Sequence, residues 1–196
     1  MNPANKLTLI RVILVPFFLL FMYIDVPCHF LIALVIFSAA SITDALDGHI
    51  ARKNNLITNF GKFLDPLADK VLVMAALAVF IDIDEVGMSA IPFIIITARE
   101  FMVSGLRLLA ANSGVVVAAG IWGKLKTAFT MVTIIGINAW LVFVYDFGGF
   151  GLNLNDTFYS VSGIFISSMI WISTVLTVIS GIIYLKAYWN LIDSDK

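Results

Sequence analysis

Six apolar stretches, each long enough to cross a lipid bilayer, constrain this chain more than any other feature. An α-helix rises 1.5 Å per residue, so about 20 apolar residues cross about 30 Å of hydrocarbon. The connections between most of the stretches are short, and the sequence has no internal repeat. We therefore predict an all-α fold in one domain, residues 1–196: a polytopic membrane protein with six transmembrane helices. The predicted spans are 7–25, 29–52, 62–82, 88–111, 123–145 and 161–189.

Composition excludes two other classes of protein. Hydrophobic residues make up 61% of the chain and charged residues only 13%, whereas a soluble domain usually carries about 25% charged residues. The mean hydropathy is +1.01, and a water-soluble fold of this length could not bury so much apolar surface. The net charge of -1 argues against nucleic-acid binding.

The first apolar stretch could be either a signal peptide or a retained helix. It runs from Val12 to Ile24 and is followed by Asp25-Val26-Pro27. This boundary lacks the small-x-small pattern of a cleavage site, so we expect the first span to be retained.

Charged residues are segregated between the two sides of the predicted spans. If the amino terminus is cytoplasmic, every lysine and arginine near a span end lies on the cytoplasmic side. The connections on the opposite side contain aspartate and glutamate but no lysine or arginine. This positive-inside pattern predicts a protein of the cell (inner or plasma) membrane with both termini in the cytoplasm. The basic residues are Lys6, Arg11, Arg52, Lys53, Lys62, Arg107, Lys124, Lys126, Lys186 and Lys196. The acids opposite are Asp25, Asp82, Asp84, Glu85, Asp146 and Asp156.

Four further acids lie inside the predicted spans, near the cytoplasmic side. Asp44 and Asp47 are three residues apart late in the second span, and Asp65 and Asp69 are four apart early in the third. Each pair therefore shares one helical face. Because the connection between the two spans is short, we expect antiparallel neighbours whose four carboxylates converge. Ionised groups at such positions are costly and usually functional.

Four converging carboxylates would repel one another strongly unless cations offset them. Hard oxygen ligands favour Mg²⁺ or Mn²⁺ over zinc, and a two-metal site suits phosphoryl transfer. One alternative is that the acids form ion pairs with Arg52, Lys62 and Lys70. Another is a cation pathway in a transporter, although the broken helices and repeats typical of transporters are absent from the sequence.

The residues among the acids suit a phosphate ligand. Gly48 and Gly61 leave room for a ligand or backbone to approach, and Gly61 shares the spacing of four that links Asp65 and Asp69. Arg52 offers a fork of donors to a diphosphate, and Thr58 adds a hydroxyl nearby.

The motif Asp44-x₂-Asp47-Gly48-x₂-Ala51-Arg52-x₈-Gly61-x₃-Asp65-x₃-Asp69 resembles the signature of the CDP-alcohol phosphotransferase family at every fixed position. The resemblance implies six transmembrane helices, usually paired as a homodimer, and a polar cavity open to the cytoplasm. It implies that Asp44, Asp47, Asp65 and Asp69 hold two Mg²⁺ or Mn²⁺ ions and that Asp69 is also the catalytic base. It also implies that CDP-diacylglycerol is bound by Gly48, Arg52, Thr58 and Gly61.

The amino-terminal segment also resembles the family, in which a short segment with Asn and Thr contacts the nucleotide. Here it reads Asn2-Pro3-Ala4-Asn5-Lys6-Leu7-Thr8. The family usually places Pro directly before the second Asn, whereas Ala4 intervenes in this chain. The resemblance implies that Asn5 and Thr8 bind CDP-diacylglycerol; the alternative is that they cap the first helix.

The segments 61–70, 97–101, 104–107 and 123–127 resemble the branch of the family whose acceptor is glycerol 3-phosphate. This implies an enzyme of phospholipid biosynthesis that forms phosphatidylglycerol phosphate and CMP. Arg99, Arg107, Lys124 and Lys126 would hold the acceptor's phosphate. Arg99 and Glu100 lie deep in a span and should face the bundle interior. Alternatively, they form a structural polar pair with other helices, and Lys124 and Lys126 only reflect the positive-inside bias. Phosphatidylglycerol and inositol phosphate remain alternative acceptors.

Overall fold

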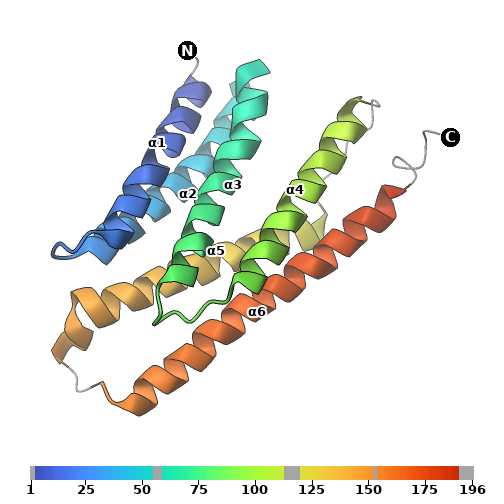
Figure 1. Ribbon diagram of the computed structural model, residues 1–196. Helices are drawn as coiled ribbons and strands as arrows, with labels where there is room; N and C mark the ends of the chain where they lie inside the picture. The colour runs from blue at the N-terminus through green and yellow to red at the C-terminus, as the bar shows by residue number, and fades with distance from the viewer. Residues whose placement is uncertain (1–2, 55–58, 113–119, 152–153, 190–196) are drawn as a thin grey trace.

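The computed structural model describes residues 3–54, 59–112, 120–151 and 154–189. Its side chains are described for all of these except 3–7, 44–54, 59–67, 69, 111–112 and 149–150. The described residues form six α-helices (Figure 1), which confirms the predicted all-helical class. The helices are α1 (Pro3–Tyr23), α2 (His29–Asn54), α3 (Asn59–Asp82), α4 (Ala90–Asn112), α5 (Ile121–Leu141) and α6 (Asp156–Ala187).

The helices follow the six predicted spans to within a few residues at most boundaries. By length and composition, two helical stretches of the described chain are able to cross a membrane: Ile121–Asp146 and Asp156–Ala187. Shorter apolar helical stretches are Thr8–Tyr23 and His29–Thr43. Many large apolar side chains remain exposed, including Ile121 at 82%. A surface of this kind suits a lipid environment.

The connection between α5 and α6 is shorter than predicted. The sequence favoured a loop over 146–160, but α5 continues as a π-helical turn, η1 (Val142–Asp146), and a 3₁₀ turn, η2 (Gly148–Gly151), follows. Helix α6 then begins at Asp156, because the Asn155 side chain caps it by accepting a hydrogen bond from the Phe158 N–H at 3.0 Å. Such a cap lets a helix begin in a polar segment that hydropathy assigns to a loop.

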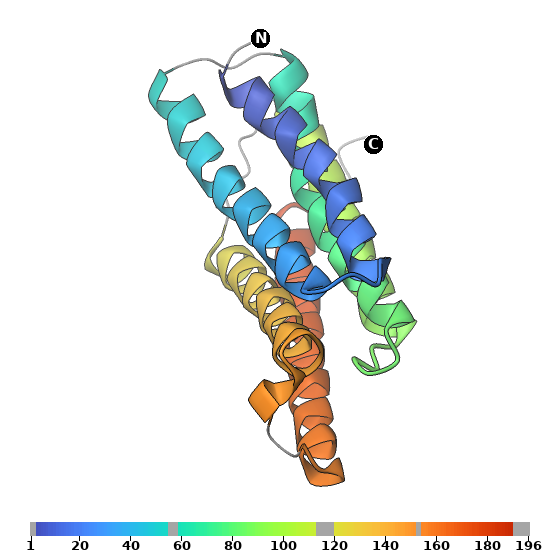
Figure 2. The same ribbon diagram turned by 90° about the vertical axis from the view of Figure 1, so that its left-hand side faces the viewer.

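Helix α1 packs against both α2 and α3 (Figure 2). Helices α2 and α3 run in opposite directions, as expected, but they contact each other only over a short length. The core includes the fully buried Phe18 of α1 and Phe37 of α2, whose ring centroids are 5.7 Å apart. Helix α5 packs on α2 and α6, and α6 packs on α4. The sequence did not predict that α1 would pack against both α2 and α3, the two helices that carry the acids.

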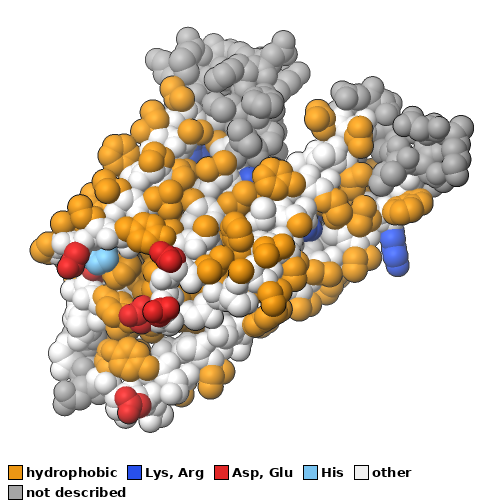
Figure 3. Space-filling model, viewed as in Figure 1, with side chains coloured by type: hydrophobic (Ala, Val, Ile, Leu, Met, Phe, Trp, Pro, Cys, Tyr) orange, Lys and Arg blue, Asp and Glu red, His pale blue; other side chains and the backbone are white. Residues whose placement is uncertain are grey.

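The acidic connections gather at one end of the bundle, as Figure 3 shows. One of these acids has a structural role: Asp146 Oδ2 accepts a hydrogen bond from the Leu31 N–H at 2.6 Å, near the start of α2. The described basic side chain Lys186 lies near the opposite end of α6. The acidic connections and the basic Lys186, which the sequence places on opposite sides of the spans, therefore also lie at opposite ends of the bundle.

Cysteine labelling tests whether the acidic end faces away from the cytoplasm. In a Cys28→Ala background we would place one cysteine at Asp84 or at Lys186, both of which are exposed. An impermeant maleimide should label position 84 in right-side-out vesicles and position 186 only after permeabilisation. Labelling of position 186 in sealed vesicles would reverse the predicted orientation.

Candidate active site

The two segments that carry the aspartate motif lie at the same end of the bundle. The carboxyl end of α2 and the amino end of α3 flank the amino end of α1 (Figure 2). Thr58 lies outside the described residues, and so do several of the other predicted site side chains. Those side chains are Asn5, Asp44, Asp47, Gly48, Arg52, Gly61, Asp65 and Asp69. Within the described side chains, there is no group of three or more His, Cys, Asp or Glu that could hold a metal ion.

Helix α1 buries two polar side chains close to these segments. Thr8 and Arg11 are each only 1% exposed, and their spacing of three places them on one face of the helix. The sequence reasoning counted Arg11 among the basic residues at cytoplasmic ends and loops, but the structure places it inside the bundle. A buried arginine is costly unless it is paired. The spacing of three between Thr8 and Arg11 was the one sequence feature that could have indicated that Arg11 is buried.

An ion cluster joins α4, α5 and α6. Glu100 Oε1 of α4 accepts hydrogen bonds from Arg99 Nη1 at 3.1 Å and from Lys126 Nζ of α5. Arg99 Nη2 donates to Ser180 Oγ of α6 at 2.6 Å. Arg99 and Lys126 are buried, and the Glu100 side chain is 17% exposed. Arg99 and Glu100 thus face the bundle interior, as the sequence predicted.

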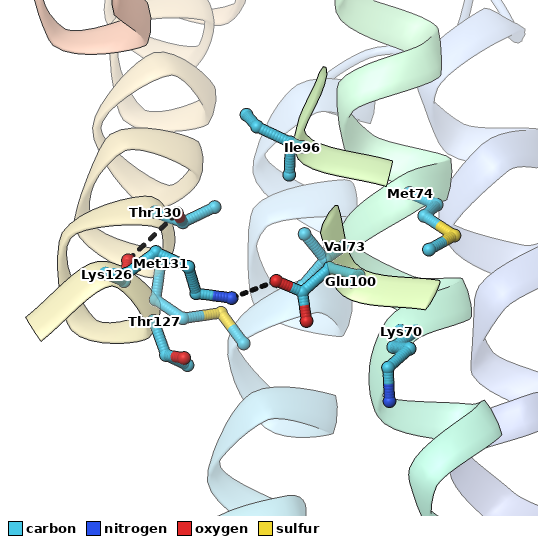
Figure 4. A pocket seen from close by; sticks show the side chains of 9 residues that line it. All are labelled: Lys70, Val73, Met74, Ile96, Glu100, Lys126, Thr127, Thr130 and Met131. Atoms are coloured by element: carbon cyan, nitrogen blue, oxygen red, sulfur yellow. Dashed lines mark hydrogen bonds and ion pairs between the residues drawn. The ribbon is translucent and has the colours of Figure 1, made fainter. Parts of the chain in front are cut away.

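A cavity of about 40 Å³ lies between α3, α4 and α5 (Figure 4). Figure 4 shows Glu100 between the amino groups of Lys70 and Lys126. Lys70 directly follows Asp69, so the cavity connects the motif segment of α3 with the ion cluster. The described side chains around it carry more positive than negative charge, which favours an anionic ligand. The remaining lining residues are Val73, Met74, Ile96, Thr127, Thr130 and Met131.

Tyr184 of α6 links the ion cluster to Arg107. Its hydroxyl accepts hydrogen bonds from Arg107 Nη2 and from the Gly120 N–H, each at 3.0 Å. The structure therefore brings three of the predicted acceptor residues, Arg99, Arg107 and Lys126, into one connected network, whereas Lys124 is exposed.

Two residues of this network, Ser180 and Tyr184, were not predicted from the sequence as site residues, and neither was the position of Lys70 beside it. Lys70 was considered only as an ion-pair partner of the acids. The one available signal was the spacing of four between Ser180 and Tyr184, which places both on one face of α6.

The chain is similar to known proteins over most of its length. The profile of the CDP-alcohol phosphatidyltransferase family matches residues 1–179. A CDP-diacylglycerol--glycerol-3-phosphate 3-phosphatidyltransferase of Bacillus subtilis (strain 168) is 39% identical over 100% of this chain and 99% of its own length. Proteins of the same name from Rickettsia bellii (strain RML369-C) and Escherichia coli (strain K12) are 38% and 41% identical. They cover 95% and 72% of this chain, and 94% and 76% of their own lengths.

The shared carboxylate of Glu100 predicts a measurable coupling. Glu100→Gln should lower the free energy of unfolding by about 3 kcal/mol, because it removes the charged carboxylate that Arg99 and Lys126 share. Adding Lys126→Met should recover part of that loss, with a coupling energy of at least about 1 kcal/mol in a double-mutant cycle. Unfolding in detergent, followed by tryptophan fluorescence, measures both quantities, and the exposed Asp84→Asn is the control. Strict additivity of the two substitutions would contradict the ion cluster.

Proposed function

The chain belongs to the CDP-alcohol phosphatidyltransferase family, and we propose that it transfers the phosphatidyl group of CDP-diacylglycerol to glycerol 3-phosphate. The products are phosphatidylglycerol phosphate and CMP. The observation that carries the proposal is the 39% identity, over nearly the full length of both chains, to a relative named for this reaction. We also propose that the six helices span the cell membrane with the aspartate motif on the cytoplasmic side, and that the chain forms a homodimer.

The donor site in this proposal is formed by α1, α2 and α3. Asp44, Asp47, Asp65 and Asp69 supply only oxygen ligands, a donor set that suits Mg²⁺ or Mn²⁺. When bound, the ions would offset the negative charge of the CDP diphosphate. The buried Thr8 of α1 lies at the same end of the bundle as both motif segments and is a proposed contact for CDP-diacylglycerol. The other proposed contacts are Asn5, Gly48, Arg52, Thr58 and Gly61.

The acceptor site in this proposal lies beside the donor site, at the network of α4, α5 and α6. Arg99, Arg107 and Lys126 bind the phosphate of glycerol 3-phosphate, and the exposed Lys124 attracts it. Arg99 Nε is buried and has no hydrogen-bond partner among the described residues, so Arg99 retains a donor for an anion.

The ion cluster forms one wall of the cavity, because Glu100 and Lys126 both line it and pair with each other. We propose that the acceptor's phosphate replaces Glu100 as the partner of Lys126 and thereby enlarges the cavity.

The chemical step uses the carboxylate of Asp69. In the proposed mechanism Asp69 removes the proton from the C1 hydroxyl of glycerol 3-phosphate. The resulting alkoxide forms a bond to the β-phosphorus of CDP-diacylglycerol. The bond from that phosphorus to the bridging oxygen breaks, and CMP leaves with the electron pair. Lys70, the residue that follows Asp69 in the sequence, lines the proposed acceptor cavity.

The acceptor can be identified by CMP release from purified protein in detergent. We expect release from CDP-diacylglycerol with glycerol 3-phosphate, and none with inositol phosphate or phosphatidylglycerol. Chelation with EDTA should abolish the release, and added Mg²⁺ or Mn²⁺ should restore it. Release with another acceptor in place of glycerol 3-phosphate would overturn the proposed acceptor while leaving the family unchanged.

Substitution of the proposed base tests the mechanism. Asp69→Asn should lower kcat by about 100-fold or more, because an amide cannot take the proton from the acceptor. Asp84→Asn, at the opposite end of the bundle, serves as the matched control and should leave kcat unchanged. Near-normal turnover of Asp69→Asn, in protein with an unchanged unfolding temperature, would show that Asp69 is not the base.

A further inference from the structure

Tyr184 contacts two of the residues that bind the phosphate in our proposal, Arg99 and Arg107. Its side chain is only 4% exposed, on the last turns of α6. Its hydroxyl accepts from Arg107 on α4 and from the backbone of Gly120, the residue that precedes α5. One oxygen therefore holds together the carboxyl half of α4 and the start of α5.

The ring of Tyr184 contacts two arginines. The guanidinium carbons of Arg99 and Arg107 lie 5.6 Å and 5.4 Å from its centroid, within the range of a cation–π interaction. These arginines are eight residues apart, about 12 Å along the axis of α4. The same ring thus limits the positions of both guanidinium groups.

Two glycines allow this arrangement. A Cβ atom on Gly123 of α5 would come within 3.3 Å of the Tyr184 hydroxyl. A Cβ atom on Gly181 of α6 would come within 3.0 Å of Arg99 Cγ. Even a methyl group at either position would press against the tyrosine or the arginine. The close contacts at Gly123 and Gly181 indicate that the proposed acceptor site depends on the positions of the Tyr184 and Arg99 side chains.

We propose that Tyr184 is a positioning residue that orients Arg99 and Arg107 for the acceptor's phosphate and fixes the start of α5. This inference rests on the proposed function. Arg107 is exposed, and an exposed arginine that is not held by a neighbour loses rotamer freedom when it binds a ligand. The hydroxyl and ring of Tyr184 restrict that freedom before the acceptor arrives. Tyr184 therefore affects the affinity for the phosphorylated acceptor, not the affinity for the donor.

Steady-state kinetics with each substrate varied in turn test this role. Tyr184→Phe keeps the ring and removes the hydroxyl, and we expect it to raise the KM for glycerol 3-phosphate about tenfold. The KM for CDP-diacylglycerol and the unfolding temperature should stay unchanged. Tyr188→Phe removes a hydroxyl four residues further along the chain, at the residue that follows α6, and is the matched control. Gly123→Ala leaves Tyr184 in place but pushes against its hydroxyl, so it should raise the same KM by a smaller factor.

The outcomes separate this inference from the proposed function. If Arg107→Ala raises the KM for glycerol 3-phosphate but Tyr184→Phe and Gly123→Ala do not, the role of Tyr184 is wrong and the acceptor site stands. If the Tyr184→Phe and Gly123→Ala proteins lose stability and both KM values change together, Tyr184 is merely structural and the inference is overturned. If the wild-type protein does not use glycerol 3-phosphate at all, the proposed function fails first and the inference fails with it.

Discussion

A charge placed among apolar helices must be paired, and this requirement governs how α4, α5 and α6 pack together. Glu100 lies between Arg99 and Lys126, and Arg99 donates a hydrogen bond to Ser180, so this cluster links α4, α5 and α6. Removing one partner of such a group leaves a charge without compensation, at a cost of several kcal/mol. The same cations that stabilise the bundle are the ones that suit a phosphate ligand.

The pairing has a consequence for binding. In the proposed function, the phosphate of the acceptor competes with the carboxylate of Glu100 for Lys126. A ligand that replaces one anion with another leaves the cations paired throughout, and so avoids the desolvation penalty of an isolated charge. In the proposed function, the acceptor's phosphate uses cations that also belong to the structural ion cluster, so the alternatives weighed from the sequence for Arg99 and Glu100 are compatible.

The helices could be predicted from the sequence because the length of an apolar stretch is a direct property of the chain. The start of α6 was less predictable, since the cap formed by Asn155 depends on local geometry in a polar segment. Lys70, Ser180 and Tyr184 could not be placed in the site, because spacing shows only which residues share a helix face, and the partners of Ser180 and Tyr184 lie on other helices. Arg11 was assigned to the basic side by its position, whereas its burial follows from how α1 packs on α2 and α3. The four aspartates of the motif remain predicted as the metal site, since their side chains lie outside the described part of the chain.

Helix α1 sets the separation of the two helices that carry the motif. The motif lies on the consecutive helices α2 and α3, which make few contacts with each other, whereas each of them packs against α1. A hairpin of α2 and α3 alone would lack this packing surface. Helix α1, which carries none of the four acids, therefore acts as the spacer between the two halves of the motif.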